Sequence, residues 1–439
     1  MQFHPPQAVL EIAERLEDAG FEAWCVGGAI RDVILGHPHL DWDLATSATP
    51  DQVRKLFGAR RTIPVGIDFG TVGVLDRDNK MHEVTTFRRD VQTDGRHAVV
   101  EFGVSLKDDL ARRDFTINAI AYSPRRDEIE DPFDGRSDLD AKVVRAVGDP
   151  DERMREDRLR ALRAIRFAAR FGFAIEPATH RAIENSAPYL GRLSLERVKQ
   201  ELDKTMEQVR RPSEALKVWR ATGAFGTLIP ELTSVSDHDL LAVDCLAQPG
   251  ALRRPSRRML RFAGMLASLD AKTAAKVMTA LRSSRAEVQG VEQLVDRYGR
   301  FGMAIAQSVS AGIPSDGEVR RWVAGIGRLQ VGAVMRLASA RWSADRLSGM
   351  AAPDALAVRS LYRRMVRSAF RDPLDVGSLA IDGDDLRTAG IPPGPVLGRI
   401  LTALLEQVID DPARNARDWL LREAAVLDRR FRLDSETLG

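Results

Sequence analysis

Cysteine is scarce in this chain, which has only Cys25 and Cys245 among its 439 residues. Two cysteines so far apart supply neither a disulfide framework nor the paired spacing of a zinc site. The sequence also lacks a run of about 18 apolar residues, so no transmembrane helix is predicted. Its N-terminal segment has no basic stretch followed by an apolar one, which argues against a secretory signal. These absences favour a protein of the reducing cytoplasm with no membrane span.

An excess of one charge is also absent, because 65 basic and 63 acidic residues leave a net charge of only +2. Basic residues still cluster locally, for example at residues 153–170. Such clusters permit nucleic-acid binding, although a solvated helix face explains any one of them equally well. The apolar fraction of 44% indicates a folded protein. A chain of this length predicts about two to four domains.

The N-terminal part, residues 1–140, has the pattern of a mixed α/β region. Strand-like runs at residues 70–76 and 82–87 are separated by turn-forming residues and predict an antiparallel hairpin. From about residue 150 the apolar residues recur at helical spacing, and helical segments continue to the C-terminus. The sequence therefore predicts an α+β protein with its sheet near the N-terminus.

A glycine pair, Gly27-Gly28, follows a predicted strand, and Asp41 and Asp43 flank Trp42 in the next one. Because side chains alternate along a strand, the two carboxylates share a face about 6–7 Å apart. Two such carboxylates can bridge two Mg²⁺ ions, which activate a hydroxyl and steady a leaving pyrophosphate. Paired glycines let backbone amides approach a triphosphate closely. The pattern predicts a nucleotide-transfer site.

An exposed acidic loop explains a lone Asp-x-Asp better than a metal site does. A glycine turn, a short helix and then Asp-x-Asp on a strand form a more specific order. That order is typical of the nucleotidyltransferase superfamily with the polymerase-β-like fold. Glu83, on a later strand, is a candidate third catalytic carboxylate, and a charged strand end is an equally good interpretation of it.

Several uncommon segments occur in one order over residues 20–175: VGGAIRDVILG, DWDLATSATP, EVTTFR, DLARRDFTINAIAY, DPFDG and EDRLRALRAIRFAARFGF. In order and spacing they resemble the bacterial class II tRNA nucleotidyltransferase and poly(A) polymerase family. LSLERVKQEL extends the resemblance to about residue 225. The resemblance implies a polymerase-β-like head with a mixed or antiparallel sheet at 1–140, followed by all-α parts. These are a neck at 141–225, a body at 226–310 and a tail at 311–439.

The resemblance also implies a set of nucleotide-binding residues. They are Gly27, Gly28, Arg31, Arg113, Asp114, Asn118, Asp157, Arg160 and Arg163. Arginine suits this role because its planar fork donates two bonds to a phosphate. Asn118 serves the ribose or the local turn, with the two roles equally favoured, and Arg163 is equally well explained as a solvated arginine. Phe115 and Ile117 are expected in the core, and Asp131 in a turn or helix cap.

Asp157 and Arg160 are three residues apart, so we expect them side by side on one helix face. A carboxylate acceptor beside a guanidinium donor matches the Watson–Crick edges of adenine and cytosine and opposes those of uracil and guanine. A mismatched base would leave buried polar groups unpaired. An intrahelical salt bridge worth about 0.3–0.5 kcal/mol is the plain alternative. The family uses this pair for base selection, which favours that role here.

The segment Arg88–Phe102 resembles the flexible loop that this family uses to switch from C to A addition. Its presence argues for addition of the final A. It departs from the family at His97-Ala98, where a basic residue and a proline are usual.

Residues 238–300 faintly resemble the HD phosphohydrolase domain fused to some family members. The metal-binding His-Asp pair of that domain is replaced by Ala267-Ser268, which leaves His238 and Asp239 alone. We therefore expect a helical scaffold without its metal site. Candidate RNA-phosphate contacts in this region are Arg253, Arg254, Arg257 and Arg258.

Together these patterns predict an enzyme that adds CCA to tRNA 3′ ends from CTP and ATP, with two Mg²⁺ ions held by Asp41 and Asp43. A poly(A) polymerase or an enzyme that adds only the terminal A shares the same catalytic motifs and is the nearest alternative. An HD-type phosphohydrolase is a weaker one. No membrane partner is expected.

Overall fold

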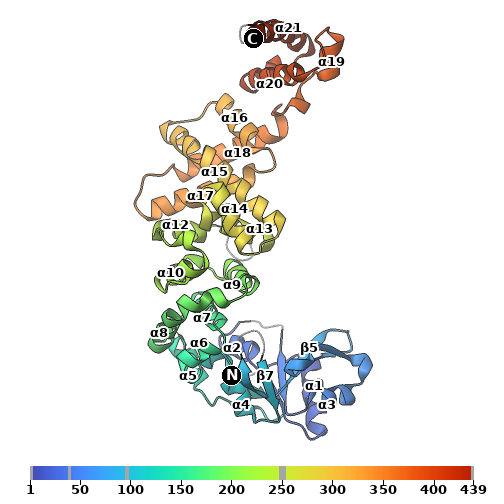
Figure 1. Ribbon diagram of the computed structural model, residues 1–439, viewed down its shortest axis with the longest axis vertical. Helices are drawn as coiled ribbons and strands as arrows, with labels where there is room; N and C mark the ends of the chain where they lie inside the picture. Colours follow the sequence, from blue (N-terminus) through green and yellow to red (C-terminus); the bar gives the residue numbers. More distant parts are fainter. Residues whose placement is uncertain (1–2, 38–40, 94–97, 247–253, 437–439) are drawn as a thin grey trace. The chain divides into compact units, whose positions relative to one another are not determined.

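The computed structural model describes residues 3–37, 41–93, 98–246 and 254–436. The chain divides into two compact units, Met1–Ser234 and Val235–Gly439 (Figure 1). In the described segments, no helix combines the length and the apolar character needed to span a bilayer. Each unit is described by itself below.

The first unit contains a seven-stranded sheet with the order β3-β4-β5-β2-β1-β8-β9. Its strands are β1 (Ala23–Val26), β2 (Asp43–Thr46), β3 (Thr62–Gly66), β4 (Thr71–Leu75), β5 (Met81–Thr86), β8 (Ala121–Ser123) and β9 (Glu128–Glu130). β2 and β5 are parallel, and the other neighbours are antiparallel. The predicted mixed sheet is therefore confirmed, as is the predicted hairpin, which β4 and β5 form.

Short helices pack around this sheet: α1 (Gln7–Asp18), α2 (Gly28–Ile34), α3 (Pro50–Phe57), α4 (Leu106–Ala111) and α5 (Gly135–Ala141). The helix α3 shows why they form. Thr49 and Gln52 make a capping box around Pro50, and Gly58 ends the helix at φ +83°. Phe115 and Ile117 are fully buried, as predicted.

The segment expected as a flexible loop is a hairpin where the structure describes it. Strands β6 (Arg88–Thr93) and β7 (Ala98–Phe102) pair antiparallel, with Arg88 opposite Phe102. His97 lies outside the described residues, and so does the side chain of Ala98. This pairing depends on contacts across strands, which local sequence does not reveal. The role of the segment in the switch from C to A addition stays a prediction.

The rest of the first unit is helical apart from the two-stranded pair β10 (Val143–Val144) and β11 (Ala174–Ile175). Its helices are α6 (Pro150–Glu156), α7 (Leu159–Phe171), α8 (Pro177–Ser186), α9 (Leu195–Gln208), α10 (Pro212–Ala221) and α11 (Ala224–Leu228). The helix α7 buries Leu162 and Ile165 and contacts α9 and α10. Its arginines recur on another face, at Arg160, Arg163 and Arg170.

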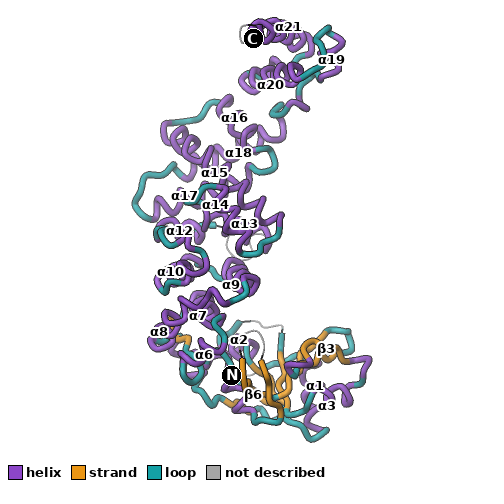
Figure 2. Tube along the Cα trace, in the orientation of Figure 1, coloured by secondary structure: helices purple, strands orange, loops and turns teal. Residues whose placement is uncertain are grey.

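The second unit consists of helices and loops in its described part, as Figure 2 shows. The helices are α12 (Asp237–Asp244), α13 (Arg254–Leu266), α14 (Ala271–Ala280), α15 (Arg285–Ala311), α16 (Asp316–Ile326), α17 (Val331–Leu347), α18 (Ala355–Arg371), α19 (Gly383–Thr388), α20 (Pro395–Asp410) and α21 (Arg417–Glu436). α17 contacts α12, α13, α15 and α18. The last three helices share an apolar cluster around Leu386, Leu404 and Leu420.

The predicted arginine face of α13 does not form as expected. Arg257 is 3% exposed, so its guanidinium is not displayed for RNA. Arg258 is partly exposed and forms an ion pair with Glu287 at 2.8 Å. The run Arg254–Arg261 is basic, but the packing of α13 against α15 and α17 turns part of it inward. Arg253 lies outside the described residues, and the side chain of Arg254 does too.

His238 and Asp239 also have structural partners. His238 Nε2 lies 2.8 Å from Asp345, and Asp239 pairs with Arg341 at 2.6 Å. Asp239 in addition caps α12 by accepting a hydrogen bond from Ser236. These contacts fasten α12 to α17.

Candidate active site

A cavity of about 600 Å³ lies in the first unit, between strands β2 and β5 and helices α7 and α9. All of the predicted nucleotide-binding residues line it: Gly27, Gly28, Arg31, Arg113, Asp114, Asn118, Asp157, Arg160 and Arg163. Asp43 and Glu83 line it as well. Asp41 is not among its lining residues. The folded chain thus collects residues spread over more than one hundred positions around a single space.

The acidic edge of the cavity follows strand alternation. Asp41 and Asp43 are exposed, whereas Trp42 and Leu44 are buried, which is the alternation expected of a strand, but β2 itself begins only at Asp43. Asp43 lies beside Glu83, because Leu44 is in register with Val84 on the parallel neighbour β5. Among the described residues, no group of three or more histidine, cysteine or carboxylate side chains is close enough to hold a metal ion. Glu83 therefore does not form such a group with Asp41 and Asp43, and the role of these two carboxylates as metal ligands stays a prediction.

The glycine turn before α2 has a geometry that excludes a side chain. Gly27 has φ +74° and ψ −126°, which is strained for any residue with a Cβ. A Cβ added there would lie 2.9 Å from Nη1 of Arg113. The Arg113 side chain therefore passes directly over the turn. A guanidinium and the Gly28 end of a helix meet at this point, which suits a phosphate.

A buried network joins the sheet to helix α7. Asp114 forms an ion pair with Arg163 at 2.6 Å, and its other oxygen accepts a hydrogen bond from Asn118. Burial opposes ionisation of Asp114, but the charge of Arg163 and the hydrogen bonds outweigh it and lower the pKa of the carboxyl. Asn118 in turn accepts a bond from Arg31, which pairs with Asp32. Both polar atoms of Asn118 are thus engaged within the protein.

The expected side-by-side placement of Asp157 and Arg160 on one helix is wrong. Asp157 is extended and ends α6, whereas α7 begins at Leu159. Its carboxylate accepts from the Leu159 amide and pairs with Arg197 at 2.7 Å. Arg160 pairs with Glu156 at 2.6 Å and donates to the Arg112 carbonyl. Both side chains still line the cavity, each with another partner.

Sequence reasoning missed several residues that line the same cavity. They are Arg166, Arg170, Arg197, Lys204 and Gln208, and Arg112 of the family-like segment DLARRDFTINAIAY lines the cavity too. Arg166 forms a buried pair with Glu201 at 2.6 Å, which ties α7 to α9. Two signals pointed to them: the helical spacing of arginines along α7, and the LSLERVKQEL segment that becomes α9.

The loop before α5 packs closely against the segment that carries Asn118. Asp131 accepts hydrogen bonds from the amides of Gly135 and Arg136, which is the predicted turn role. Asp134 is left-handed at φ +56°, a conformation that glycine adopts readily and that aspartate tolerates. A Cβ on Gly135 would lie 2.2 Å from the Thr116 carbonyl oxygen. The chain therefore crosses the segment that carries Asn118 at close range.

Comparison with known proteins decides the family. A model described as "Poly A polymerase head domain" matches residues 23–145, and one described as "Probable RNA and SrmB- binding site of polymerase A" matches residues 172–235. The CCA-adding enzyme of Limosilactobacillus fermentum is 34% identical over 429 residues, covering 97% of each chain. The chain belongs to the family of CCA-adding enzymes. The predicted family resemblance is confirmed, and the chain is a nucleotidyltransferase.

Two further family members show the same extent of similarity. The CCA-adding enzyme of Lactiplantibacillus plantarum is 33% identical over 431 residues, covering 96% of both chains. The crystal structure of the Bacillus stearothermophilus CCA-adding enzyme in complex with CTP is 30% identical, with a TM-score of 0.73. That likeness covers 99% of this chain and 100% of the other. The predicted fold, a polymerase head followed by helices, is the fold of the family.

Proposed function

We propose that this chain adds C, C and A in turn to the 3′ ends of tRNA, taking the nucleotides from CTP and ATP and releasing pyrophosphate. The observation that carries the proposal is similarity along the whole chain to proteins named CCA-adding enzymes. The cavity supports it, because the carboxylate of Asp43, the glycine turn at Gly27 and the candidate base-selecting residues Asp157 and Arg160 line one space. A tRNA-maturing enzyme of this kind works in the cytoplasm.

The acidic edge fits Mg²⁺ as cofactor. Two exposed carboxylates, Asp41 and Asp43, offer the oxygen donors that this ion prefers, and Mg²⁺ is usually held by one or two carboxylates together with substrate phosphates. When bound, two such ions supply charge that favours an ionised 3′-hydroxyl and a leaving pyrophosphate. Glu83, next to Asp43, adds negative charge at the same edge and is proposed as an accessory catalytic carboxylate.

The glycine turn and Arg113 are proposed to hold the triphosphate. Gly27 leaves open the space directly under Nη1 of Arg113, so a phosphate oxygen can meet both the backbone and the guanidinium. Arg163 and Asn118 hold Asp114 in place behind this contact. A fixed donor set of this kind orients the α-phosphate for in-line attack by the 3′-hydroxyl.

Base choice is proposed to rest on Asp157 and Arg160. Adenine and cytosine each present an amino donor next to a ring-nitrogen acceptor, which complements a carboxylate and a guanidinium. In the structure Asp157 is held by Arg197 and Arg160 by Glu156. To bind a base, Asp157 must therefore offer a free lone pair and Arg160 a free N–H. Otherwise each side chain must release its protein partner and bond to the base instead. Uracil and guanine present the reverse pattern of donors and acceptors, so they would not form hydrogen bonds with the two side chains in this arrangement.

Three tRNA substrates test the proposal: one that lacks CCA, one that ends in the first C and one that ends in CC. Each is incubated with CTP, ATP or both. We expect CTP alone to extend the first two substrates only as far as CC. ATP alone should extend only the third, by one residue. Extension of all three by A alone would instead favour a poly(A) polymerase, and extension of the third alone under every condition would favour an A-adding enzyme.

A further inference from the structure

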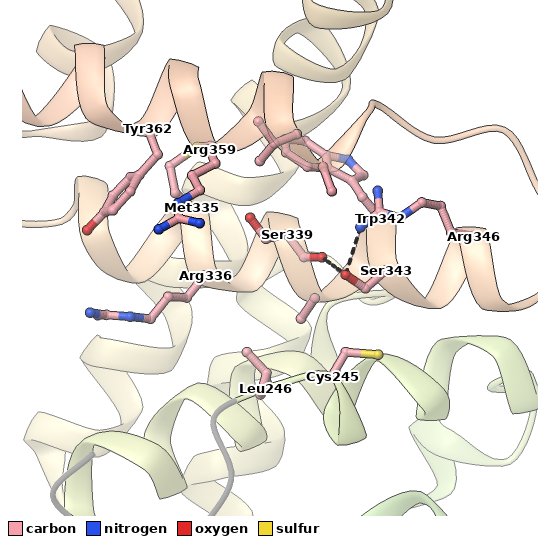
Figure 3. Close-up of a pocket in the computed structure, with 13 residues that line it drawn as sticks. Cys245, Leu246, Met335, Arg336, Ser339, Trp342, Ser343, Arg346, Arg359 and Tyr362 are labelled. Carbon is pink, nitrogen blue, oxygen red and sulfur yellow. Dashed lines mark hydrogen bonds between the residues drawn. The ribbon is translucent and has the colours of Figure 1, made fainter. Parts of the chain in front are cut away.

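A second cavity, of about 460 Å³, lies within the second unit, where the end of α12 faces α17 and α18 (Figure 3). Its walls include Leu246, Met335, Trp342 and Val358, which make part of it apolar. Among the residues that the structure describes, no aspartate or glutamate lines it, whereas Arg336, Arg346 and Arg359 do. A pocket whose only charged lining groups are arginines attracts anions.

The arginines of the cavity differ in how they are held. Arg346 donates to the Pro353 carbonyl and to Ser343 at one end of the pocket. At the other end Figure 3 places the polar tips of Arg336, Arg359 and Tyr362. Like Arg346, Arg336 and Arg359 form no ion pair within the described residues, and both are exposed.

Three other arginines of this unit are paired with an acid. Arg341 pairs with Asp239 at 2.6 Å, Arg364 with Asp316 at 2.5 Å and Arg258 with Glu287 at 2.8 Å. Arg336 and Arg359 differ from these three arginines in having no acid partner within the described residues. The charge of two guanidiniums there is available for a ligand.

A glycine keeps the space between these groups open. A Cβ added to Gly332 of α17 would lie 3.5 Å from the Tyr362 hydroxyl oxygen and 3.7 Å from Nη1 of Arg336. Both donors therefore converge over the same point of the helix. An oxygen placed there can accept from the guanidinium and from the phenol together.

We infer that Arg336, Arg359 and Tyr362 form a phosphate-binding site for the backbone of the RNA substrate. The inference rests on the proposed function, because tRNA supplies the phosphates. It moves the RNA contact from α13, where Arg257 is buried and Arg258 is paired, to the facing sides of α17 and α18. Contacts of this kind fix the position of the RNA without reading its sequence.

The test measures tRNA affinity by fluorescence anisotropy across a series of salt concentrations, with full-length protein and tRNA that lacks CCA. The double variant Arg336→Gln/Arg359→Gln is expected to bind more weakly, by roughly 5- to 10-fold per lost contact at 0.1 M salt. The slope of log affinity against log salt should become shallower by about 1 per arginine. Gly332→Glu, which fills the gap and adds a negative charge, should weaken binding similarly.

The matched control is Arg364→Gln, which removes an arginine of the same helix that already has Asp316 as partner. It is expected to leave affinity and salt slope unchanged, and thermal unfolding of every variant checks that the fold survives. At saturating tRNA the double variant should add CCA at the wild-type rate with unchanged KM for CTP and ATP. The rate of CCA addition at saturating tRNA therefore tests the proposed function, whereas tRNA affinity tests this site.

Unchanged tRNA affinity in the double variant and in Gly332→Glu would overturn the inference. A second arm uses inorganic phosphate as probe. If phosphate raises the melting temperature of the wild type but not of the double variant, while both bind tRNA equally, the pocket takes free phosphate and the assignment to RNA is wrong.

Discussion

Asp157 and Arg197 form an ion pair at 2.7 Å across the gap between the end of α6 and the first turn of α9. The proposed base-reading carboxylate is thus held by a residue from a separate helix. Both side chains are partly buried, which makes this pair more than a surface contact. If Asp157 reads the base as proposed, Arg197 positions it.

Removal of Arg197 should impair use of both correct nucleotides. In Arg197→Met the carboxylate of Asp157 loses a charged hydrogen bond, and kcat/KM for CTP and ATP should fall by roughly tenfold or more. Arg197→Lys should recover part of the loss. Steady-state kinetics with tRNA ending in C and in CC measure both values. Arg181→Gln, an exposed arginine on α8, is the control. Equal losses in Arg181→Gln would show that the effect is not specific to Asp157.

Removal of the carboxylate itself should relax the choice of base. Asp157→Ala no longer opposes the carbonyl of uracil or guanine, so UTP and GTP should be incorporated at measurable rates, while Mg²⁺ dependence stays close to normal. Sequencing the extended 3′ ends gives the fraction of each base. If that variant still rejects UTP and GTP as strongly as the wild type does, Asp157 does not read the base.

Replacement of Asp43 should stop chemistry without loosening the RNA. Asp43→Asn keeps the shape of the side chain and removes its charge, and incorporation should fall by ~10²–10³-fold or more. Affinity for tRNA should stay within about twofold, since phosphate contacts dominate it. Single-turnover extension and anisotropy measure the two quantities. Normal turnover by Asp43→Asn or by Asp41→Asn would contradict the proposed metal site.

A methyl group at the glycine turn should block the triphosphate. Gly27→Ala places a Cβ 2.9 Å from Nη1 of Arg113, and its positive φ costs about 1–3 kcal/mol as well. We expect KM for CTP and ATP to rise by tenfold or more. Gly20→Ala is the control for backbone strain alone, because Gly20 also has positive φ but no atom within 4 Å of an added Cβ. A normal KM in Gly27→Ala would rule out the proposed phosphate contact.

The partly buried ion pair of Asp114 and Arg163 should make the free energy of unfolding depend on pH in the acid range. The folded protein lowers the pKa of Asp114 below its unfolded value of about 3.9. A depressed carboxyl pKa stabilises the fold above the unfolded pKa, and this stability is lost as pH falls through the folded pKa. Asp114→Asn should therefore unfold more easily at pH 7, and its disadvantage relative to the wild type should shrink in acid. Urea unfolding at several pH values measures this, and a constant difference would contradict it.

Local features of the site follow from the sequence. The alternation of exposed Asp41 and Asp43 with buried Trp42 and Leu44 could be predicted because it depends on neighbouring residues only. Asp131 binds the amides of its own turn for the same reason. Contacts between distant segments do not follow. The ion pair of Asp157 with Arg197 spans forty positions, and the break between α6 and α7 that exposes Asp157 to α9 depends on packing.

The arginines of the second unit illustrate the same limit. Composition alone favours α13, where basic residues are densest, yet packing buries Arg257. Arg359 belongs to α18, which is also rich in arginine, and Arg336 belongs to α17, so density of basic residues does not single out this pair. Whether such an arginine is free to bind a ligand depends on which acids lie near it in the tertiary structure, and the sequence alone does not show this.

The central claim is tested most directly by sequencing the 3′ ends of tRNA that lacks CCA after incubation with all four nucleoside triphosphates and Mg²⁺. We predict that the products end in C, C and A and that extension stops there. Products that carry A tails, or that contain U or G at any of these positions, would contradict the claim.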